Sequence, residues 1–553
     1  MKKFICDVLV VGAGVAGVRA ALAAQENNAS VLLAVKGKMG KSGASTFRVT
    51  EHGGFCVADG RKDPTDSPDV HYNDIMFAGH KMCVPEDVRT LVNNAKDTFL
   101  DMEKYGVTFV KKNGEYLITT GCFGTKPRTY QLAEHGSSLI GPLAKHFNEH
   151  TQLLENCMIV ELIVEDHVAK GAIGLMNTGE FVMIVAKSVI LTCGGAGQMF
   201  KYSLNPQEMT GDSCAMGYRA GAKIANLEFM QIGCGILWPK LNILNSWIWA
   251  QHPHLLDKDG ASALTPYLPA DLDEAKVMDA KSTHYPFSSV SISRYIEIGI
   301  HKTMVNGKAL AHGGVKFDAV EALKNSKNSR SRLFQDMWST SDAWYQKNGI
   351  DLEHKSVEVG CFAHAMNGGL VINKKAETTV KHLYAVGEAS TGTHGADRLG
   401  GNMLIQCVVF GKIAGTNAAK EAQSSELPKI DEGRWESFVT DAKKTSDQAK
   451  TLPAKDFLDT LQTLNFNNLL INRSEEKCIV ATKGLKKLEA EFPHVSYDGC
   501  SPWMKYDLPN LLLVSRLMVE AIRHRKESRG SHYREDYTEE NAAYDKPYFF
   551  NDK

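Results

Sequence analysis

A single arginine lies inside a glycine-rich turn in the stretch THGADRLGGNML, residues 393–404. Glycines precede and follow Arg398, and the apolar run that begins at Met403 predicts a helix directly after the turn. Glycine lets a backbone approach a ligand closely, and a guanidinium can pair with a carboxylate through two parallel hydrogen bonds. The pattern therefore favours a site where the backbone borders a cofactor and Arg398 binds an anionic substrate. The alternative is an arginine on the protein surface.

The element that would hold such a cofactor stands at the front of the chain. DVLVVGAGVAGVRAALAAQENNASVLLAVK, residues 7–36, predicts a strand, a glycine turn, an alanine-rich helix and a second strand. Gly12, Gly14 and Gly17 form G-x-G-x-x-G at that turn. The first glycine allows the tight turn, the second lets the backbone approach a pyrophosphate, and the third lets the helix pack on the strand. We therefore expect a dinucleotide site here.

The residues at the end of the second predicted strand help to distinguish NAD from FAD as the dinucleotide. The acidic residue that usually binds the NAD ribose is replaced by Val35 and Lys36. This weakens a simple NAD interpretation and is compatible with FAD held by other contacts. The Gly/Ser/Ala-rich loop KMGKSGASTF, residues 38–47, can bring several backbone N–H groups onto a ligand, although a surface loop is the alternative. Gly53 and Gly54 in EHGGF offer another position of close approach.

Bulk composition excludes several classes of protein. The chain has 553 residues with a formal net charge of -1, so we expect two to four domains and no electrostatic attraction to nucleic acid or to an anionic membrane. Twelve cysteines without a C-x-x-C pair lack the spacing of a zinc site or an iron–sulfur cluster, and we predict no metal site. Free thiols and the absence of a run of about 18 apolar residues favour a cytoplasmic protein that does not itself span a membrane.

Three later stretches make a family pattern. They are SVILTCGGAGQMF (188–200), NPQEMTGDSCAMGYRAGAKIANLEFMQ (205–231) and LYAVGEASTGTHGADRLGGNML (383–404). With the first βαβ unit, their order resembles the flavoprotein subunit of the succinate dehydrogenase/fumarate reductase family, which includes L-aspartate oxidase. The resemblance covers nearly the whole chain.

The resemblance implies an α/β fold and a domain plan. A discontinuous Rossmann-like FAD-binding domain is expected at 1–235 and 352–433, with an inserted α+β capping domain at 236–351. A helical C-terminal region and tail would occupy 434–553, and the polar, proline-containing stretch SSELPKIDEGRWE supports its start independently.

The same resemblance assigns a set of FAD-binding residues. They belong to the pyrophosphate turn, the loop around the ribityl and phosphate groups, later glycine turns, and the helix start that faces the flavin pyrimidine edge. These residues are Gly12, Gly14, Ala16, Gly17, Lys36, Ser42, Gly43, Ala44, Ser45, Thr46, Gly53, Gly54, Thr192, Gly194, Gly195, Asp212, Glu388, Met403 and Leu404. Many members attach FAD covalently to a histidine, where Phe47 falls here, and His52 is in the wrong register. We therefore expect noncovalent FAD.

Arg398, His364 and Arg294 are the catalytic residues that the resemblance implies. Arg398 matches the arginine that binds a substrate carboxylate, and His364 in CFAHAMNGG matches a histidine that assists it, although Met366 and Asn367 alter the usual order. A satisfied histidine that holds the loop is the alternative for His364. Arg294 matches the second arginine of the capping-domain motif R-D-x-x-x-R.

The other half of the family site differs in this chain. Ser289 stands where the proton-delivering first arginine would be, and Gly233 and its neighbours replace an H-P-T stretch after E-F-x-Q. Trp238, Trp247 and Trp249 cluster near the altered end. If they line the site, they suit an apolar or aromatic part of a substrate, whereas the alternative is a stabilising role within the capping domain. Candidates for the replacement acid or base are His252, His254, Tyr267, His284, Tyr285 and Arg294.

Three functions are compatible with this pattern. The first is an FAD-dependent oxidoreductase that acts on a C–C bond next to a carboxylate, by hydride transfer between flavin N5 and the substrate, on a substrate other than fumarate or succinate. The second is oxidation of an amino acid, as in L-aspartate oxidase. The third is a flavin electron-transfer subunit of a larger redox complex. An iron–sulfur or other electron-carrier subunit is an expected partner, through which the chain could associate peripherally with a membrane.

Overall fold

The glycine turn at the front of the chain joins β1 (Lys2–Val11) to α1 (Val15–Glu26), and β2 (Val31–Ala34) follows in parallel with β1. The computed structural model describes residues 1–46, 53–133, 136–324, 329, 331–444 and 450–551. The β-branched and apolar residues from Val8 to Val11 are buried in β1, and every residue of β2 is buried. This βαβ unit is the one that the sequence predicts.

The central sheet gathers strands from distant parts of the chain. Its strands follow the order β8-β2-β1-β11-β10-β9, where β8 is Thr151–Leu154, β9 Cys157–Glu165, β10 Val168–Met176 and β11 Phe181–Leu191. β19 (Leu383–Ala385) pairs in parallel with the end of β11. The parallel strands β8, β2, β1, β11 and β19 therefore bring the loops that follow them to one edge of the sheet.

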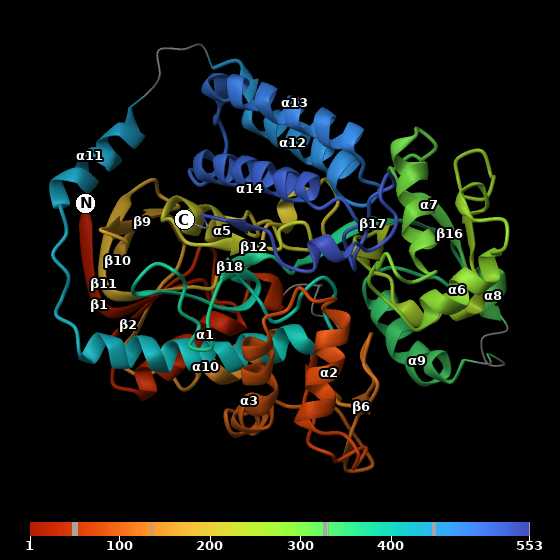
Figure 1. Ribbon diagram of the computed structural model, residues 1–553, viewed down its shortest axis with the longest axis horizontal. Coiled ribbons are helices and arrows are strands. Elements are labelled where there is room, and N and C mark those ends of the chain that lie inside the picture. The colour runs from red at the N-terminus through yellow and green to blue at the C-terminus, as the bar shows by residue number, and fades with distance from the viewer. Residues whose placement is uncertain (47–52, 134–135, 325–328, 330, 445–449, 552–553) are drawn as a thin grey trace.

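One long helix packs closely on the first. α10 (Asn402–Gln423) runs beside α1 along one side of the sheet (Figure 1). A Cβ added at Gly415 would stand 2.1 Å from the carbonyl oxygen of Ala20, and one at Gly411 would stand 2.8 Å from that of Ala16. Only glycine permits this separation of the helices, and so the start of α10 is fixed relative to the glycine turn.

Two strands lead from the central part of the molecule into a separate lobe, which appears at the right of Figure 1. β13 (Met230–Trp238) and β17 (Val357–Met366) pair antiparallel in the five-stranded sheet β14-β13-β17-β16-β15. The other strands are β14 (Asn242–Ile243), β15 (His254–Leu256) and β16 (Val315–Asp318). The lobe is completed by η4 (Ser246–Gln251), α6 (Glu274–Ser282), α7 (Arg294–Val305), α8 (Val320–Lys324) and α9 (Arg332–Lys347).

The last part of the chain is helical, and α12, α13 and α14 lie on the side of the molecule away from α10 (Figure 1). They follow α11 (Glu432–Lys443) and span Ala454–Leu469, Glu475–Glu491 and Met504–His524. Trp435 of α11 is buried with apolar residues of β9, β10 and β11. The mixed α/β class with a C-terminal helical region is thus confirmed.

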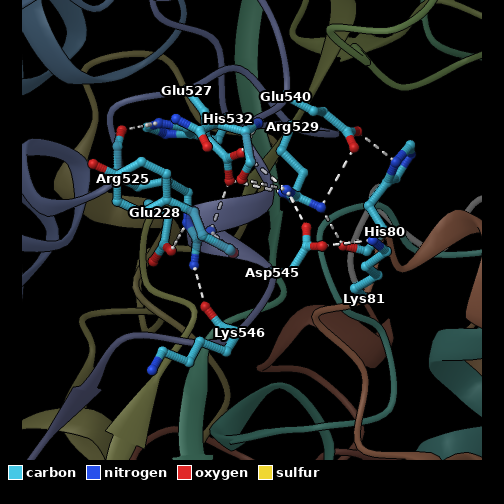
Figure 2. Close-up of polar contacts among 12 residues, drawn as sticks. His80, Lys81, Glu228, Arg525, Glu527, Arg529, His532, Glu540, Asp545 and Lys546 are labelled. Carbon is cyan, nitrogen blue, oxygen red and sulfur yellow. Dashed lines mark hydrogen bonds and ion pairs between the residues drawn. The ribbon is translucent and has the colours of Figure 1, made fainter.

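A buried network of charges attaches the chain's tail to the body (Figure 2). The Arg525 guanidinium donates to Glu228 at 2.6 Å and to Glu527 at 2.8 Å, and Arg529 donates to Glu527 at 2.7 Å and to Asp545 at 2.9 Å. Both arginines are at most 1 % exposed. These contacts make the stretch KESRGSHYRED, residues 526–536, part of the packed structure. Further along the tail, β23 (Phe549–Phe550) pairs with β12 (Ile224–Ala225).

None of the helices in the described ranges combines the length and the apolar character that a membrane crossing requires.

Candidate active site

A cavity of about 390 Å³ extends from the glycine turn at the end of β1, past the start of α10, to η4 and α9 of the lobe. Most of the predicted flavin-binding residues line it. These are Gly12, Gly14, Ala16, Lys36, Ser42, Gly43, Ala44, Ser45, Gly53, Gly54, Thr192, Gly194, Asp212, Glu388, Met403 and Leu404, together with Arg398 and His364. Residues predicted from stretches far apart in sequence thus meet around one space.

Three of the predicted cofactor residues, Gly17, Thr46 and Gly195, do not line the cavity but contact residues that do or that lie close to its lining. A Cβ at Gly17 would stand 1.9 Å from the Gly12 carbonyl oxygen, so Gly17 allows helix and turn to pack, as the motif implies. A Cβ at Gly195 would stand 2.5 Å from Oε1 of Glu388. Thr46 donates from its hydroxyl to the carbonyls of Ser42 and Gly43 and so closes the loop on itself.

The glycine turn has the form of an anion cradle. Gly12 has φ +105°, a conformation that favours glycine, and Gly14 caps α1 without a side-chain hydrogen bond. The Val15 N–H donates to Oγ of Ser45 at 3.1 Å. Free N–H groups in the first turn of a helix stabilise a phosphate, and a missing Cβ at Gly14 leaves room for it. These residues fit the pyrophosphate of FAD.

Lys36 is held by two carboxylates at this end of the cavity. Its Nζ lies 3.1 Å from Oδ2 of Asp212 and 2.5 Å from Oδ1 of Asp507 on α14. Burial lowers and the two carboxylates raise the pKa of Lys36, and the net shift is upward. The charged form of the ammonium is therefore stabilised, and it is already paired with carboxylates.

Glu388 stands inside the cavity wall. Its Oε1 accepts a hydrogen bond of 2.8 Å from the backbone N–H of Met366. Burial raises the pKa of Glu388 to about 7, so the carboxyl exchanges its proton near neutral pH. Such a carboxyl group donates a hydrogen bond when protonated and accepts one when ionised, which suits binding of a ligand hydroxyl.

Arg398 is oriented by a neutral side chain. Its Nε donates to Oε1 of Gln231 on β13 at 2.9 Å. No carboxylate lies within ion-pair distance of it among the residues that the structure describes, and burial lowers the pKa of its guanidinium. A partly buried guanidinium that lines a cavity in this state is suited to bind an anion.

His364 reaches the cavity because its strand carries an extra residue. In the β13–β17 pair, Gln231 faces Ala365 while Ile232 faces Ala363, so His364 is the residue that forms a bulge. Bulges redirect side chains beside functional sites. Burial and the nearby Arg398 lower the pKa of His364 to about 3, and its buried Nδ1 has no hydrogen-bond partner among the residues that the structure describes. The imidazole is thus neutral at physiological pH.

Of the other acid–base candidates predicted from the sequence, one lines the cavity and five do not. Tyr285 lines the cavity, whereas Arg294 does not and donates from Nη1 to the Ser289 carbonyl at 2.7 Å. His252 is exposed and pairs with Asp279. The remaining three also stand outside the lining: an exposed His254, a half-buried Tyr267, and His284 packed edge-on against Phe123.

The three tryptophans separate in space. Trp247 lines the cavity. Trp249 is fully buried against Phe317, where it supports the core of the lobe, and Trp238 is 44% exposed and stacks on His312. The apolar lining near Trp247 is supplied instead by Ile243, Leu333 and Met337.

Several residues of the site were missed from the sequence. Asp507, Gln231 and Cys122 each line the cavity or contact a residue that does, and they come from three different regions. Gln231 ends the EFMQ stretch, and the match of that stretch to the family pattern E-F-x-Q is the signal that points to it. Asp397, directly before Arg398, is fully buried and accepts from the Ser288 hydroxyl at 2.6 Å; burial raises the pKa of Asp397 to about 8.

Phe47 and His52, on which the expectation of noncovalent FAD depends, lie outside the described residues. Within those residues no group of three or more histidine, cysteine, aspartate or glutamate side chains is arranged to hold a metal ion.

Comparison with known proteins places this arrangement among flavoproteins. A model described as an FAD binding domain matches residues 7–404, and one described as fumarate reductase flavoprotein C-term matches residues 458–549. The chain is 29% identical to a subunit of the fumarate reductase (CoM/CoB) of Methanothermobacter marburgensis, over 100% of this chain and 98% of that protein. It is also 29% identical to an L-aspartate oxidase of Acinetobacter baylyi, over 96% and 94%.

A solved structure also resembles this chain along nearly its whole length. Sdh1 of Mycobacterium smegmatis in complex with UQ1 superposes with a TM-score of 0.83 at 26% identity, covering 99% of this chain and 91% of that one.

Proposed function

We propose that this chain, which belongs to the FAD-binding family of fumarate reductase and L-aspartate oxidase flavoproteins, acts on a C–C bond next to a single carboxylate. As a member of that family it is an FAD-dependent oxidoreductase. Its substrate would be an acid with an apolar or aromatic portion, and not fumarate or succinate. Bound FAD supplies the hydride chemistry.

One observation carries the proposal. Arg398 lines the cavity with a neutral partner, Gln231, whereas the other cationic side chain of the lining, Lys36, is already paired with Asp212 and Asp507. Among the described lining residues this leaves one guanidinium for substrate. A dicarboxylate needs cationic or donor groups at both ends, because an unpaired buried carboxylate is costly.

The part of the lining that the lobe contributes supports an apolar substrate portion. Ile243, Trp247, Leu333 and Met337 line it. Leu333 is 38% exposed, which places it toward solvent. Aromatic and aliphatic walls with a few polar groups are typical of sites for small organic ligands.

Each polar residue then has a defined task. Arg398 binds and orients the carboxylate, and Gln231 fixes the guanidinium. His364, being neutral, donates or accepts one hydrogen bond without adding charge. Electrons would leave or enter through another subunit that carries redox centres.

Fumarate is the second candidate, because the M. marburgensis relative that this chain matches along its length is named a fumarate reductase. Amino acid oxidation is the third, because the A. baylyi relative is named an L-aspartate oxidase.

The test is anaerobic mixing of the photoreduced flavoprotein with a panel of acids from fumarate to aryl-acrylates, with flavin reoxidation followed by absorbance. Reoxidation by bulky monocarboxylates, and its loss in Arg398→Met with FAD retained, is expected. Rapid reoxidation by fumarate alone would overturn the proposed substrate class. Hydrogen peroxide release on an amino acid would favour the third candidate, and no response to any acid would favour an electron-transfer subunit.

A further inference from the structure

Position 233 of β13 carries no side chain, and the phenol of Tyr285 fills the space. A Cβ built on Gly233 would stand 2.4 Å from Oη and 2.5 Å from Cζ of Tyr285. The ring therefore lies directly on the strand, and it can do so only because residue 233 is glycine. Its hydroxyl donates to the Cys234 carbonyl at 3.2 Å.

This contact places Tyr285 beside the anion-binding residue. Side chains two apart on a strand point to the same face, at a spacing of about 6.6 Å. Gln231, which holds Arg398, and Gly233, which is covered by Tyr285, have this relation on β13. His364 approaches from the paired strand, with its ring centroid 5.6 Å from that of Tyr285. Guanidinium, imidazole and phenol thus converge on one end of the cavity.

A buried ion pair holds the backbone at Tyr285 in place. Lys281 and Glu297 pair with both side chains fully buried, and Lys281 Nζ also donates to the Tyr285 carbonyl at 2.5 Å. The same ammonium lies 6.0 Å from the centroid of the Tyr285 ring. On the other side, the Tyr285 N–H donates to Sγ of Cys122 at 3.3 Å. These two backbone contacts fix the position of Tyr285 relative to the cavity.

We propose that Tyr285 is a catalytic residue of the proposed reaction, on which this inference rests, and that it moves the proton at the carbon next to the substrate carboxylate. In the reducing direction, the O–H bond of Tyr285 breaks and a C–H bond forms at that carbon. The adjacent carbon receives the hydride that reduced FAD supplies. The phenolate then recovers a proton from water, and every step reverses in the oxidising direction.

The alternatives in the chain are less well placed. Of His252, His254, Tyr267, His284, Tyr285 and Arg294, Tyr285 is the one that lines the cavity in the described structure. His364 lines it as well, but burial and Arg398 hold its pKa at about 3, which makes it a weak base.

The experiment compares Tyr285→Phe with Tyr202→Phe, which removes a half-buried phenol hydroxyl outside the cavity lining. Each full-length flavoprotein is photoreduced and mixed with the acid that best reoxidises the wild type. We expect Tyr285→Phe to lower the limiting rate about 100-fold, the low end for loss of a general acid. Binding of the saturated acid to the oxidised protein, read from the flavin absorbance, should stay within about threefold of wild type.

A second variant keeps the test valid if Tyr285→Phe loses FAD. Gly233→Ala retains the phenol but displaces it, so its limiting rate should fall with FAD retained. If Tyr285→Phe keeps its FAD, the double variant should be no slower than the slower of the two single variants.

The outcomes separate the two proposals. Wild type that responds to no acid overturns the proposed function and this inference with it. Wild type that responds, with Tyr285→Phe equally fast, overturns the inference alone. A variant that binds the saturated acid weakly but reacts at the normal limiting rate assigns Tyr285 to binding and also overturns it.

Discussion

Gln231 on β13 accepts a 2.9 Å hydrogen bond from Nε of Arg398, so the guanidinium is fixed by an uncharged amide. A carboxylate in the same place would neutralise the arginine. The identity of residue 231 therefore controls whether Arg398 is available to a ligand.

Gln231→Glu should weaken binding of a carboxylate by at least about tenfold, because the new side chain competes for the guanidinium at short range. Titration of the oxidised flavoprotein, followed by flavin absorbance, measures the dissociation constant. Gln231→Met is the matched control, since it removes the acceptor without adding charge and should cost less. Equal binding by Gln231→Glu and wild type would contradict the role of Arg398 as the anion ligand.

Asp397 should make the protein less stable as pH rises. Burial raises its pKa to about 8, well above the value in an unfolded chain, so the folded state retains a proton that the unfolded state releases. Its stabilising contribution is complete at pH values below the unfolded pKa and is lost as pH rises through the folded pKa. Asp397→Asn should therefore gain stability relative to wild type by up to about 1.4 kcal/mol per pH unit between pH 5 and 8.

Thermal midpoints of the two proteins across that range test this expectation. The difference should widen toward alkaline pH, with Ser288 still donating to the amide oxygen of the variant. A difference that stays constant with pH would show that Asp397 is ionised in the folded protein.

Gly415→Ala should destabilise the protein by about 1–3 kcal/mol, the usual cost of overpacking. Its Cβ would stand 2.1 Å from the Ala20 carbonyl oxygen and would separate α10 from α1. Gly433→Ala on α11 is the matched control, because its Cβ would make only an ordinary 3.5 Å contact with Oδ1 of Asp431 and alanine favours a helix by about 0.5–1 kcal/mol. Denaturant unfolding of both variants should give opposite signs, and equal effects would argue against the close packing of α1 and α10.

Lys281→Met should cost about 3–5 kcal/mol of unfolding free energy, because Glu297 would be left buried and unpaired. Adding Glu297→Leu should restore most of that loss, since the charge is removed altogether. Denaturant unfolding curves of the single and double variants measure these changes in unfolding free energy. Failure of the second change to restore stability would indicate that the ammonium acts mainly through the Tyr285 carbonyl.

Local patterns were sufficient to predict the first βαβ unit and the lining glycines. The requirement for glycine at positions 12 and 17 is set by contacts within the turn or with the residues that follow the neighbouring strand β11, which a short motif can record. A Cβ at Gly14 would meet Ser45 of the later loop at 3.3 Å. The glycine-rich turn around Arg398 indicates an anion-binding arginine, whereas His364 is indicated only by the resemblance to the family. Both line the cavity.

Long-range contacts could not be predicted in the same way. Lys36 pairs with Asp507, which lies 471 positions away on α14, and nothing in the local sequence of either residue records the other. Gly233 was interpreted as a loss, because its space is filled from a different segment by Tyr285. The three tryptophans were grouped by their closeness in sequence, but a 3₁₀ turn and a strand end direct them to three environments.

The order of strands in the central sheet has a consequence for how the protein is made. β1 contains Lys2–Val11, but its sheet is completed by β11 at Phe181–Leu191 and β19 at Leu383–Ala385, and α1 is covered by α10, which ends at Gln423. At about 5–20 residues per second, synthesis separates the first strand from the last of these elements by about 20–80 s. Until α10 has been made, the nascent glycine turn lacks its covering helix, and we expect FAD to be captured only late in synthesis or after release from the ribosome.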